Sequence, residues 1–129
     1  MKNRASQRAA LGQDGAYVPG HVAAVRAILA GHPGVREGRM FGYPAFFVGK
    51  RMFACVYGQG VGVKLPADRV CGLLKRADIL PFRPHGKAPM KEWVQINHAR
   101  SEDHTADRTL VLDAMHFVSR LQKRGHYAK

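Results

Sequence analysis

The side chains in this 129-residue chain that could do chemistry are mostly histidines, with few carboxylates to accompany them. Seven histidines, against nine Asp and Glu in total, lie at His21, His32, His85, His98, His104, His116 and His126. None has the H-x-x-x-H or H-E-x-x-H spacing that places two imidazoles on one helix face. A metal centre would need ligands brought together from separate loops, so we expect neither a metal site nor a cofactor.

The cysteines and serines also lack the surroundings of a catalytic nucleophile. Cys55 lies within the apolar run MFACVY, which predicts a small buried side chain, and Cys71 has no C-x-x-C partner. The two therefore indicate neither a disulfide framework nor a zinc ribbon, and they fit a reducing cytoplasmic compartment. Ser6, Ser101 and Ser119 have no nucleophile-elbow context. The residue types thus predict a protein that is not an enzyme.

Cationic side chains are the unusual feature of the composition. The chain has 21 Lys and Arg against 9 Asp and Glu, a formal net charge of +12. Such a surface attracts polyanions by releasing their counterions. The candidates for a nucleic-acid or anion patch are Arg39, Lys50, Arg51, Lys64, Lys87 and Lys91. Because basic residues are scattered along the chain, we favour a solvated surface over such a patch, and Gly86-Lys87 lacks the spacing of a phosphate loop.

A second set of candidates is apolar. Met40, Phe41, Phe53, Met90 and Trp93 are large side chains of the kind that a small sheet and its helices bury. We interpret them mainly as core. The alternative is an apolar groove, because the Gly- and Pro-rich segments 42–44 and 84–89 could hold these side chains at a rim and admit a ligand or peptide.

The elements that must position these residues follow from hydrophobic periodicity. A first helix is predicted from Pro19 to about Gly31, with Val22, Val25, Ile28 and Leu29 on one face. Apolar and aromatic runs predict strands at 35–41, 45–48, 52–57 and 61–65, joined by tight turns. In the last of these, alternation places Lys64 opposite Val61, Val63 and Leu65.

The second half alternates between helix and strand. A helix is predicted to begin at Pro66 and to lay Val70, Leu73, Leu74 and Ala77 on the sheet. Four Pro and Gly residues limit segment 78–90 to a loop with a short strand at 79–82, and 93–96 forms a last strand. A final helix runs from an N-cap at Ser101 or Thr105 to about Lys123, with Gly125 as its C′ residue.

The predicted fold is therefore α+β with two layers: an antiparallel sheet of four to six strands packed with three helices, in the order α-β-β-β-β-α-β-α. We expect a mobile tail at 1–17, a single domain at 18–124 and a short tail at 125–129. No apolar run approaches the roughly 20 residues that span a bilayer, and the N-terminus lacks the apolar block of a signal peptide. A cytoplasmic protein without membrane contact is expected.

Four segments carry a family resemblance. They are RMFGYPA at 39–45, GKRMFA at 49–54, KL at 64–65, and the run from PF at 81–82 to GKAPMKEWV at 86–94. In this order they resemble the TfoX N-terminal domain family, from about Val18 to Leu121.

The resemblance implies an antiparallel sheet with helices packed on it, related to YjbR-like and secretion-chaperone-like folds, in a bacterial cytoplasmic protein. Full-length TfoX proteins are associated with regulating natural competence and carry a second, C-terminal domain. We expect no such second domain here, so the competence role is not carried over. The family supplies no catalytic residues.

Three functional hypotheses follow. The first is a non-enzymatic binding or regulatory module of the TfoX N-terminal type, acting through protein contacts that include self-association through an uncovered sheet face or edge. The second, from a different class, is a nucleic-acid-binding protein that uses its basic surface. An enzyme with an unrecognised pocket ranks last, because the sequence shows no polar constellation for one.

Overall fold

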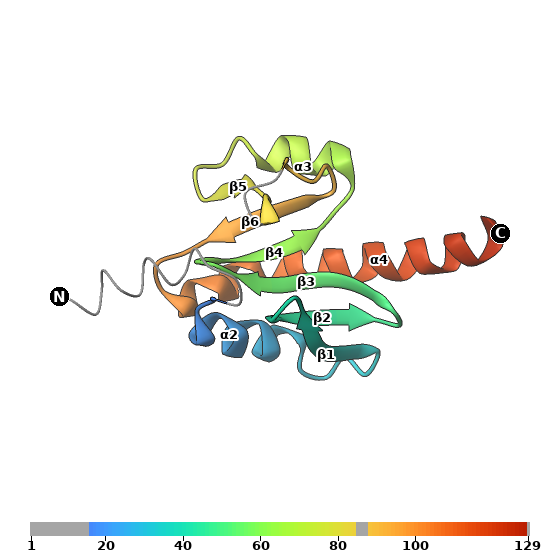
Figure 1. The fold of residues 1–129 in the computed structure, drawn as a ribbon, viewed down its shortest axis with the longest axis horizontal. Coiled ribbons are helices and arrows are strands. Elements are labelled where there is room, and N and C mark those ends of the chain that lie inside the picture. Colours follow the sequence, from blue (N-terminus) through green and yellow to red (C-terminus); the bar gives the residue numbers. More distant parts are fainter. Residues whose placement is uncertain (1–15, 85–87, 129) are drawn as a thin grey trace.

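A six-stranded antiparallel sheet forms the centre of the computed structural model, which describes residues 16–84 and 88–128. The strands are β1 (Val35–Met40), β2 (Tyr43–Val48), β3 (Arg51–Tyr57), β4 (Gly60–Lys64), β5 (Ile79–Pro81) and β6 (Trp93–Asn97). Their order across the sheet is β1-β2-β3-β4-β6-β5 (Figure 1). The predicted α+β class is confirmed, and so is the short strand after the second helix. The expected N-terminal tail lies largely outside the described residues.

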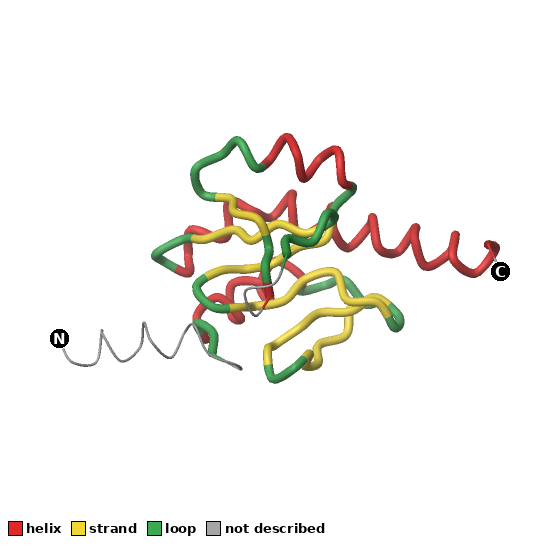
Figure 2. The backbone as a smooth tube through the Cα atoms, turned by 45° about the horizontal axis from the view of Figure 1, so that its top comes forward, coloured by secondary structure: helices red, strands yellow, loops and turns green. Residues whose placement is uncertain are grey.

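Among the described residues, three α-helices and one 3₁₀ segment accompany the sheet. They are α2 (Pro19–Leu29), α3 (Ala67–Leu73), and the 3₁₀ helix η2 (Ser101–Asp107), which continues into α4 (Arg108–Ala128). The strands pass in front of α4 in Figure 1, and the C-terminal part of α4 projects past them in both views (Figure 2). An ion pair of 2.6 Å between Arg69 and Asp113 joins α3 to α4. None of the described helices combines the length and the apolar character needed to cross a bilayer.

Several predicted boundaries are wrong. The second helix ends at Leu73, so Leu74 and Ala77 are exposed beyond it and only Val70 is fully buried on that helix. Neither proposed serine or threonine cap forms, because residues 101–107 are a 3₁₀ helix whose N-cap is Arg100. The last helix also continues through Gly125 to Ala128. A glycine costs a helix only about 1 kcal/mol, so it does not force an end.

The sheet has two differently covered faces. On the helix-covered face, side chains of α2, α3 and α4 pack with Phe46, Val56, Val61, Val63 and Ile96 in the main core. On the opposite face, which we call the groove face, a smaller cluster contains Ala45, Cys55, Phe82 and Trp93. Phe82 can lie flat there because the strand beneath it has a glycine: a Cβ on Gly62 would come within 3.2 Å of the Phe82 ring.

A bulge between β2 and β3 decides which aromatic side chains reach which face. Phe46 pairs with Ala54 and Phe47 with Met52, so Phe53 is an extra residue in the ladder. Both residues of a bulge point to the same side. Phe53 and Ala54 therefore both enter the main core, while Met52 turns to the groove face. The bulge thus exchanges the positions that strict alternation from Tyr57 would assign to Phe53 and Met52.

The two thiols should differ sharply in reactivity. Burial raises the pKa of Cys55 to about 12, whereas Cys71 is exposed on α3. Since the thiolate is the reactive form, a disulfide reagent at pH 8 should modify one thiol in the native chain and two in the unfolded chain. In a Cys71→Ser variant, the rapid reaction of the native chain with the reagent should disappear, because the exposed thiol has been removed. Rapid modification of both thiols in the native chain would contradict the placement of Cys55 beneath Phe82.

Candidate functional site

An apolar groove opens on the groove face beside the β1–β2 turn. It has a volume of about 220 Å³ and is lined by Met40, Phe41, Met52, Phe82, Pro84, Met90 and Trp93. Small-molecule sites commonly have about 300–1,000 Å³, so this groove is small for a cofactor. It is large enough for one bulky apolar side chain.

Four of the five apolar residues singled out from the sequence line this groove. They come from three separate parts of the chain: Met40 and Phe41 from the first hairpin, Met90 from the segment after β5, and Trp93 from the start of β6. Phe53 does not join them, because the bulge buries it completely in the main core. Met52 takes its place in the groove.

The wall of the groove is held together by aromatic contacts and one ion pair. Phe82 packs on Trp93 with ring centroids 5.4 Å apart and meets Tyr57 edge-on at the same distance. The Met90 amide donates to the Phe82 carbonyl at 3.1 Å, which holds Met90 beside Phe82. Lys64 lies 5.9 Å above the Trp93 ring and forms a 3.0 Å ion pair with Glu92. The groove is therefore largely formed before any ligand arrives.

Phe41 occupies an unusual conformation at the groove. It has a φ of 51° and is followed by Gly42 at 88°, so the two residues form a hairpin turn with positive φ at both central positions. Such turns favour Asn, Asp or Gly, and other residues cost roughly 1–2 kcal/mol there. The Phe41 side chain is nevertheless 77% exposed. Backbone strain of this kind clusters at functional sites, so Phe41 joins the groove as a candidate.

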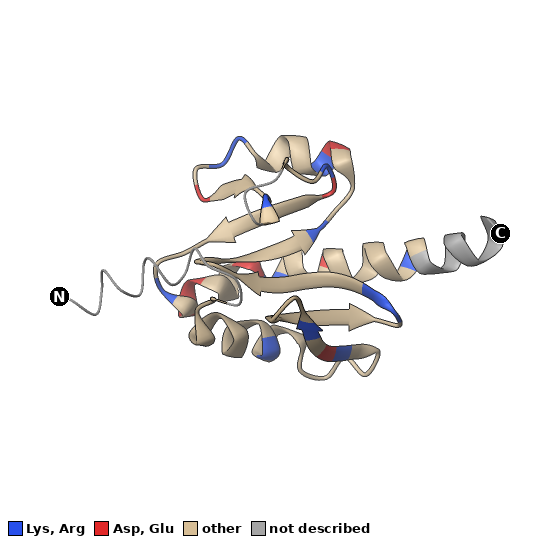
Figure 3. Ribbon diagram, in the orientation of Figure 1, with Lys and Arg blue, Asp and Glu red and all other residues tan. Residues whose placement is uncertain are grey.

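The six predicted cations are not gathered into one patch among the described residues. Arg39 lies over the Tyr17 ring, and Glu37, on the same side of β1, pairs with Arg26 of α2, so the Arg39 side chain lies on the helix-covered side. Lys50 and Arg51 lie at the β2–β3 turn, and Lys64 is already paired with Glu92. Lys91 is exposed beside Met90, and Lys87 lies outside the described residues. Figure 3 shows the same dispersal of Lys and Arg over the described ribbon.

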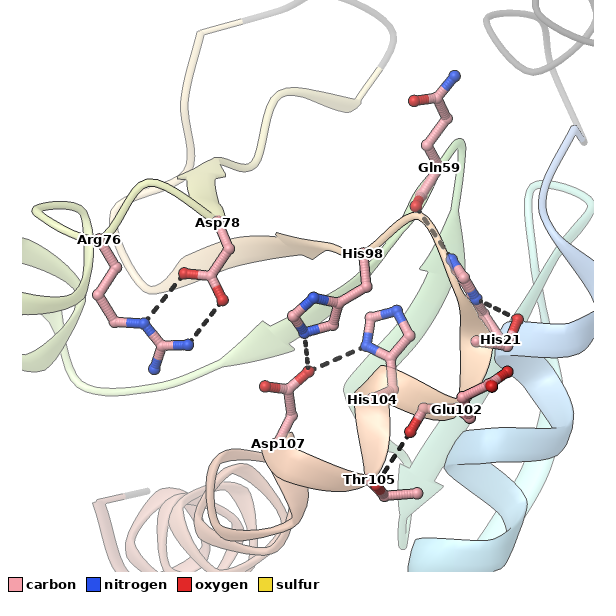
Figure 4. Close-up of polar contacts among 10 residues, drawn as sticks. His21, Gln59, Arg76, Asp78, His98, Glu102, His104, Thr105 and Asp107 are labelled. Atoms are coloured by element: carbon pink, nitrogen blue, oxygen red, sulfur yellow. Dashed lines mark hydrogen bonds and ion pairs between the residues drawn. The ribbon is translucent and has the colours of Figure 1, made fainter.

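A second polar feature, which the sequence did not indicate, joins α2, β6 and η2 (Figure 4). Asp107 accepts hydrogen bonds at one carboxylate oxygen, Oδ2, from His98 Nε2 and His104 Nδ1, each at 3.0 Å. His104 and Asp107 are buried, and His98 is partly so. The His104 ring is packed edge-on between His21 and His98, with centroids 4.3 and 4.6 Å away. We call His98, His104 and Asp107 the histidine cluster.

His21 supports the cluster from α2. Its Nε2 donates to the carbonyl of Gln59 at 3.1 Å, since a carbonyl can only accept, and its Nδ1 then accepts from the Ser101 hydroxyl at 2.7 Å. Burial, and next the neighbouring His104, lower the pKa of His21. A neutral imidazole is therefore the favoured form, and it ties the β3–β4 turn to η2 through α2.

Sequence spacing missed the cluster because its members do not repeat on one helix. His98 follows a strand, whereas His104 and Asp107 are three residues apart on a 3₁₀ helix, where such residues eclipse. The H-x-x-D pair at 104 and 107 is the one local signal that could have indicated it. Two imidazoles and a carboxylate can form a hydrogen-bonded network or bind a metal ion.

The strain at Phe41 predicts a stabilising substitution. Phe41→Asn should raise the free energy of unfolding in urea by about 1 kcal/mol relative to Phe41→Ala, because both variants remove the ring but only asparagine tolerates the left-handed conformation well. If the asparagine variant were the less stable of the two, the turn geometry assigned to residues 41 and 42 would be contradicted.

Comparison with known proteins places the chain in a family. The family model described as TfoX N-terminal domain matches residues 27–118, a range that runs from the end of α2 into α4. Comparisons with curated proteins and with solved structures gave no match. The family supports a regulatory or binding domain in general terms. Because the matched range covers more than half of the sequence, the chain belongs to the TfoX N-terminal domain family.

Proposed function

We propose that this chain is a non-enzymatic binding module whose groove takes one apolar side chain from an acidic segment of a partner protein. The observation that carries the proposal is the groove itself, with the strained and exposed Phe41 at its edge. Strained backbone conformations cluster at ligand clamps and active sites, where the strain is part of the function. Binding, rather than chemistry, is the role that an apolar lining of this size supports.

The lining suits an adaptable contact with a protein side chain. Met40, Met52 and Met90 contribute three thioethers beside the rings of Phe82 and Trp93. Methionine is flexible and polarizable, and it is common at surfaces that accept more than one apolar partner. Burying one Leu, Phe or Met anchor there would contribute about 1.5–3 kcal/mol. This corresponds to a weak, regulated contact rather than a permanent one.

Charge indicates that the segment around the anchor is acidic. The chain carries a net charge of +12, and Lys91 and Arg51 are exposed next to the lining residues Met90 and Met52. On the same face, the Arg36 guanidinium lies 4.6 Å above the Phe47 ring. Carboxylates beside the anchor would therefore meet positive potential, which raises the association rate and orients the segment.

The edges of the sheet are less suitable than the groove as binding sites for a partner or a second copy of the chain. β5 has only three residues and ends in Pro81, while β1 carries Arg36, Glu37 and Arg39 along its length. Short, charged or proline-containing edges discourage the addition of another strand. Self-association by edge pairing is therefore less well supported than insertion of a side chain into the groove.

Nucleic-acid binding has weaker support than protein binding. Net charge alone favours it, because the described cations are dispersed and several are engaged by carboxylates, as in the pairs Arg26–Glu37 and Arg76–Asp78. Within the described part of the chain, the strongly exposed aromatic ring is that of Phe41, and it lies beside an apolar groove and not within a cationic track.

Trp93 provides a direct test, since it is the only tryptophan and lines the groove. Acidic peptides with a central Phe, Leu or Ser should be titrated while its fluorescence is recorded. We expect saturable binding of the Phe or Leu peptides that is at least about tenfold weaker for the Ser peptide. A short DNA duplex serves as the competing ligand.

Matched variants localise the contact. Met90 and Leu80 are each 43% exposed, but only Met90 lines the groove. Met90→Ser should weaken binding about tenfold while Leu80→Ser leaves it unchanged. The proposal fails if no apolar-anchored peptide changes Trp93 fluorescence, if both variants act alike, or if only DNA binds.

A further inference from the structure

We propose that the histidine cluster is a binding site for a divalent transition-metal ion of the Zn²⁺ class, held by His98, His104 and Asp107. The site is separate from the groove: no residue of the cluster lines it. The donors are two imidazole nitrogens and a carboxylate oxygen. This combination suits Zn²⁺ and its first-row neighbours and is less suited to Ca²⁺ or Mg²⁺, which prefer oxygen.

The donors are already close together. His98, His104 and Asp107 each offer an atom within 4.8 Å of the others. Bonds to zinc of about 2.0–2.2 Å place neighbouring ligand atoms roughly 3.3 Å apart, so the carboxylate-to-imidazole separations of 3.0 Å need little change. The remaining adjustment would bring the imidazoles toward each other. His98 can make it, because its side chain is 17% exposed at the end of β6 whereas His104 is 2% exposed.

The unpartnered nitrogen of His104 bears on which tautomer the ring can adopt. Nδ1 donates to Asp107, so Nε2 carries a lone pair, and this buried atom has no hydrogen-bond partner among the described residues. Buried polar atoms without partners are rare and point to strain, a function or an unseen ligand. Because no partner holds Nε2 as an acceptor, the ring can carry its proton there and present the lone pair of Nδ1 to an ion held together with Asp107 and His98.

The surroundings fit a site that holds an ion in place. The cluster lies where β6, η2 and the start of α4 meet, and α2 covers it through His21, whose nitrogens are already taken by Gln59 and Ser101. On the solvent side, Asp78 is paired with Arg76, so its carboxylate is occupied. Three protein donors leave one position of a tetrahedral ion for water or an outside ligand. Binding would thus cross-link elements far apart in the sequence.

The test is a titration of the full chain with ZnCl₂, and in parallel with CoCl₂, by calorimetry and visible absorption. We expect one equivalent to bind, with the intense d–d bands of four-coordinate Co²⁺, and a dissociation constant that rises at least about tenfold in His98→Gln and His104→Gln. His116→Gln is the matched control, because His116 is exposed on α4 and outside the cluster, and it should bind as the unaltered chain does.

One measurement needs no variant. In the unaltered chain, Zn²⁺ should shift the imidazole NMR signals of His98 and His104 before those of the exposed histidines, so the proposal stays testable if a cluster variant does not fold. Absence of saturable binding, or binding that both cluster variants leave unchanged, would overturn it. Earlier shifts at other histidines would do the same.

Discussion

Burial of one sheet face beneath the helices is the constraint on which the rest of the structure depends. Val25, Phe53, Val63 and Val118 are completely buried there, and each large side chain removed from water contributes about 1.5–3 kcal/mol. Since α2, α3 and α4 all pack on this face, no described residue of these helices joins the cluster on the opposite face. Phe82 and Trp93 cover part of that face, and the groove is the space that remains between these residues and the first hairpin.

The two sites stand in different relations to this core. The groove lies on the face opposite the helices, so a partner bound there would leave the packing of the helices undisturbed. The histidine cluster lies at its end, where η2 leads into α4 and where His21 anchors α2. A peptide bound in the groove would be recognised through its side chain. An ion bound at the histidine cluster would raise the free energy of unfolding, because it would bind the folded chain only.

Much of the fold could be predicted from the sequence because its signals are local. Alternation placed Val61, Val63 and Leu65 on one face and Lys64 on the other, as the structure has them. The bulge could not be read, since nothing in GKRMFA distinguishes it from regular pairing, and it moved Phe53 out of the groove and Met52 into it. The histidine cluster depends on contacts between β6 and η2 that no periodicity encodes. The N-caps predicted at Ser101 or Thr105 were also wrong, because the last helix is preceded by a 3₁₀ helix whose N-cap is Arg100.

Nuclear Overhauser contacts in the 14.3 kDa chain test most directly which side chains lie on each face of the sheet. We expect contacts from the Phe53 ring to side chains of α4, and from the Met52 methyl group to the rings of Trp93 or Phe82. Contacts of Phe53 with Trp93, together with contacts of Met52 to α4, would show a regular β2–β3 pairing and contradict the account.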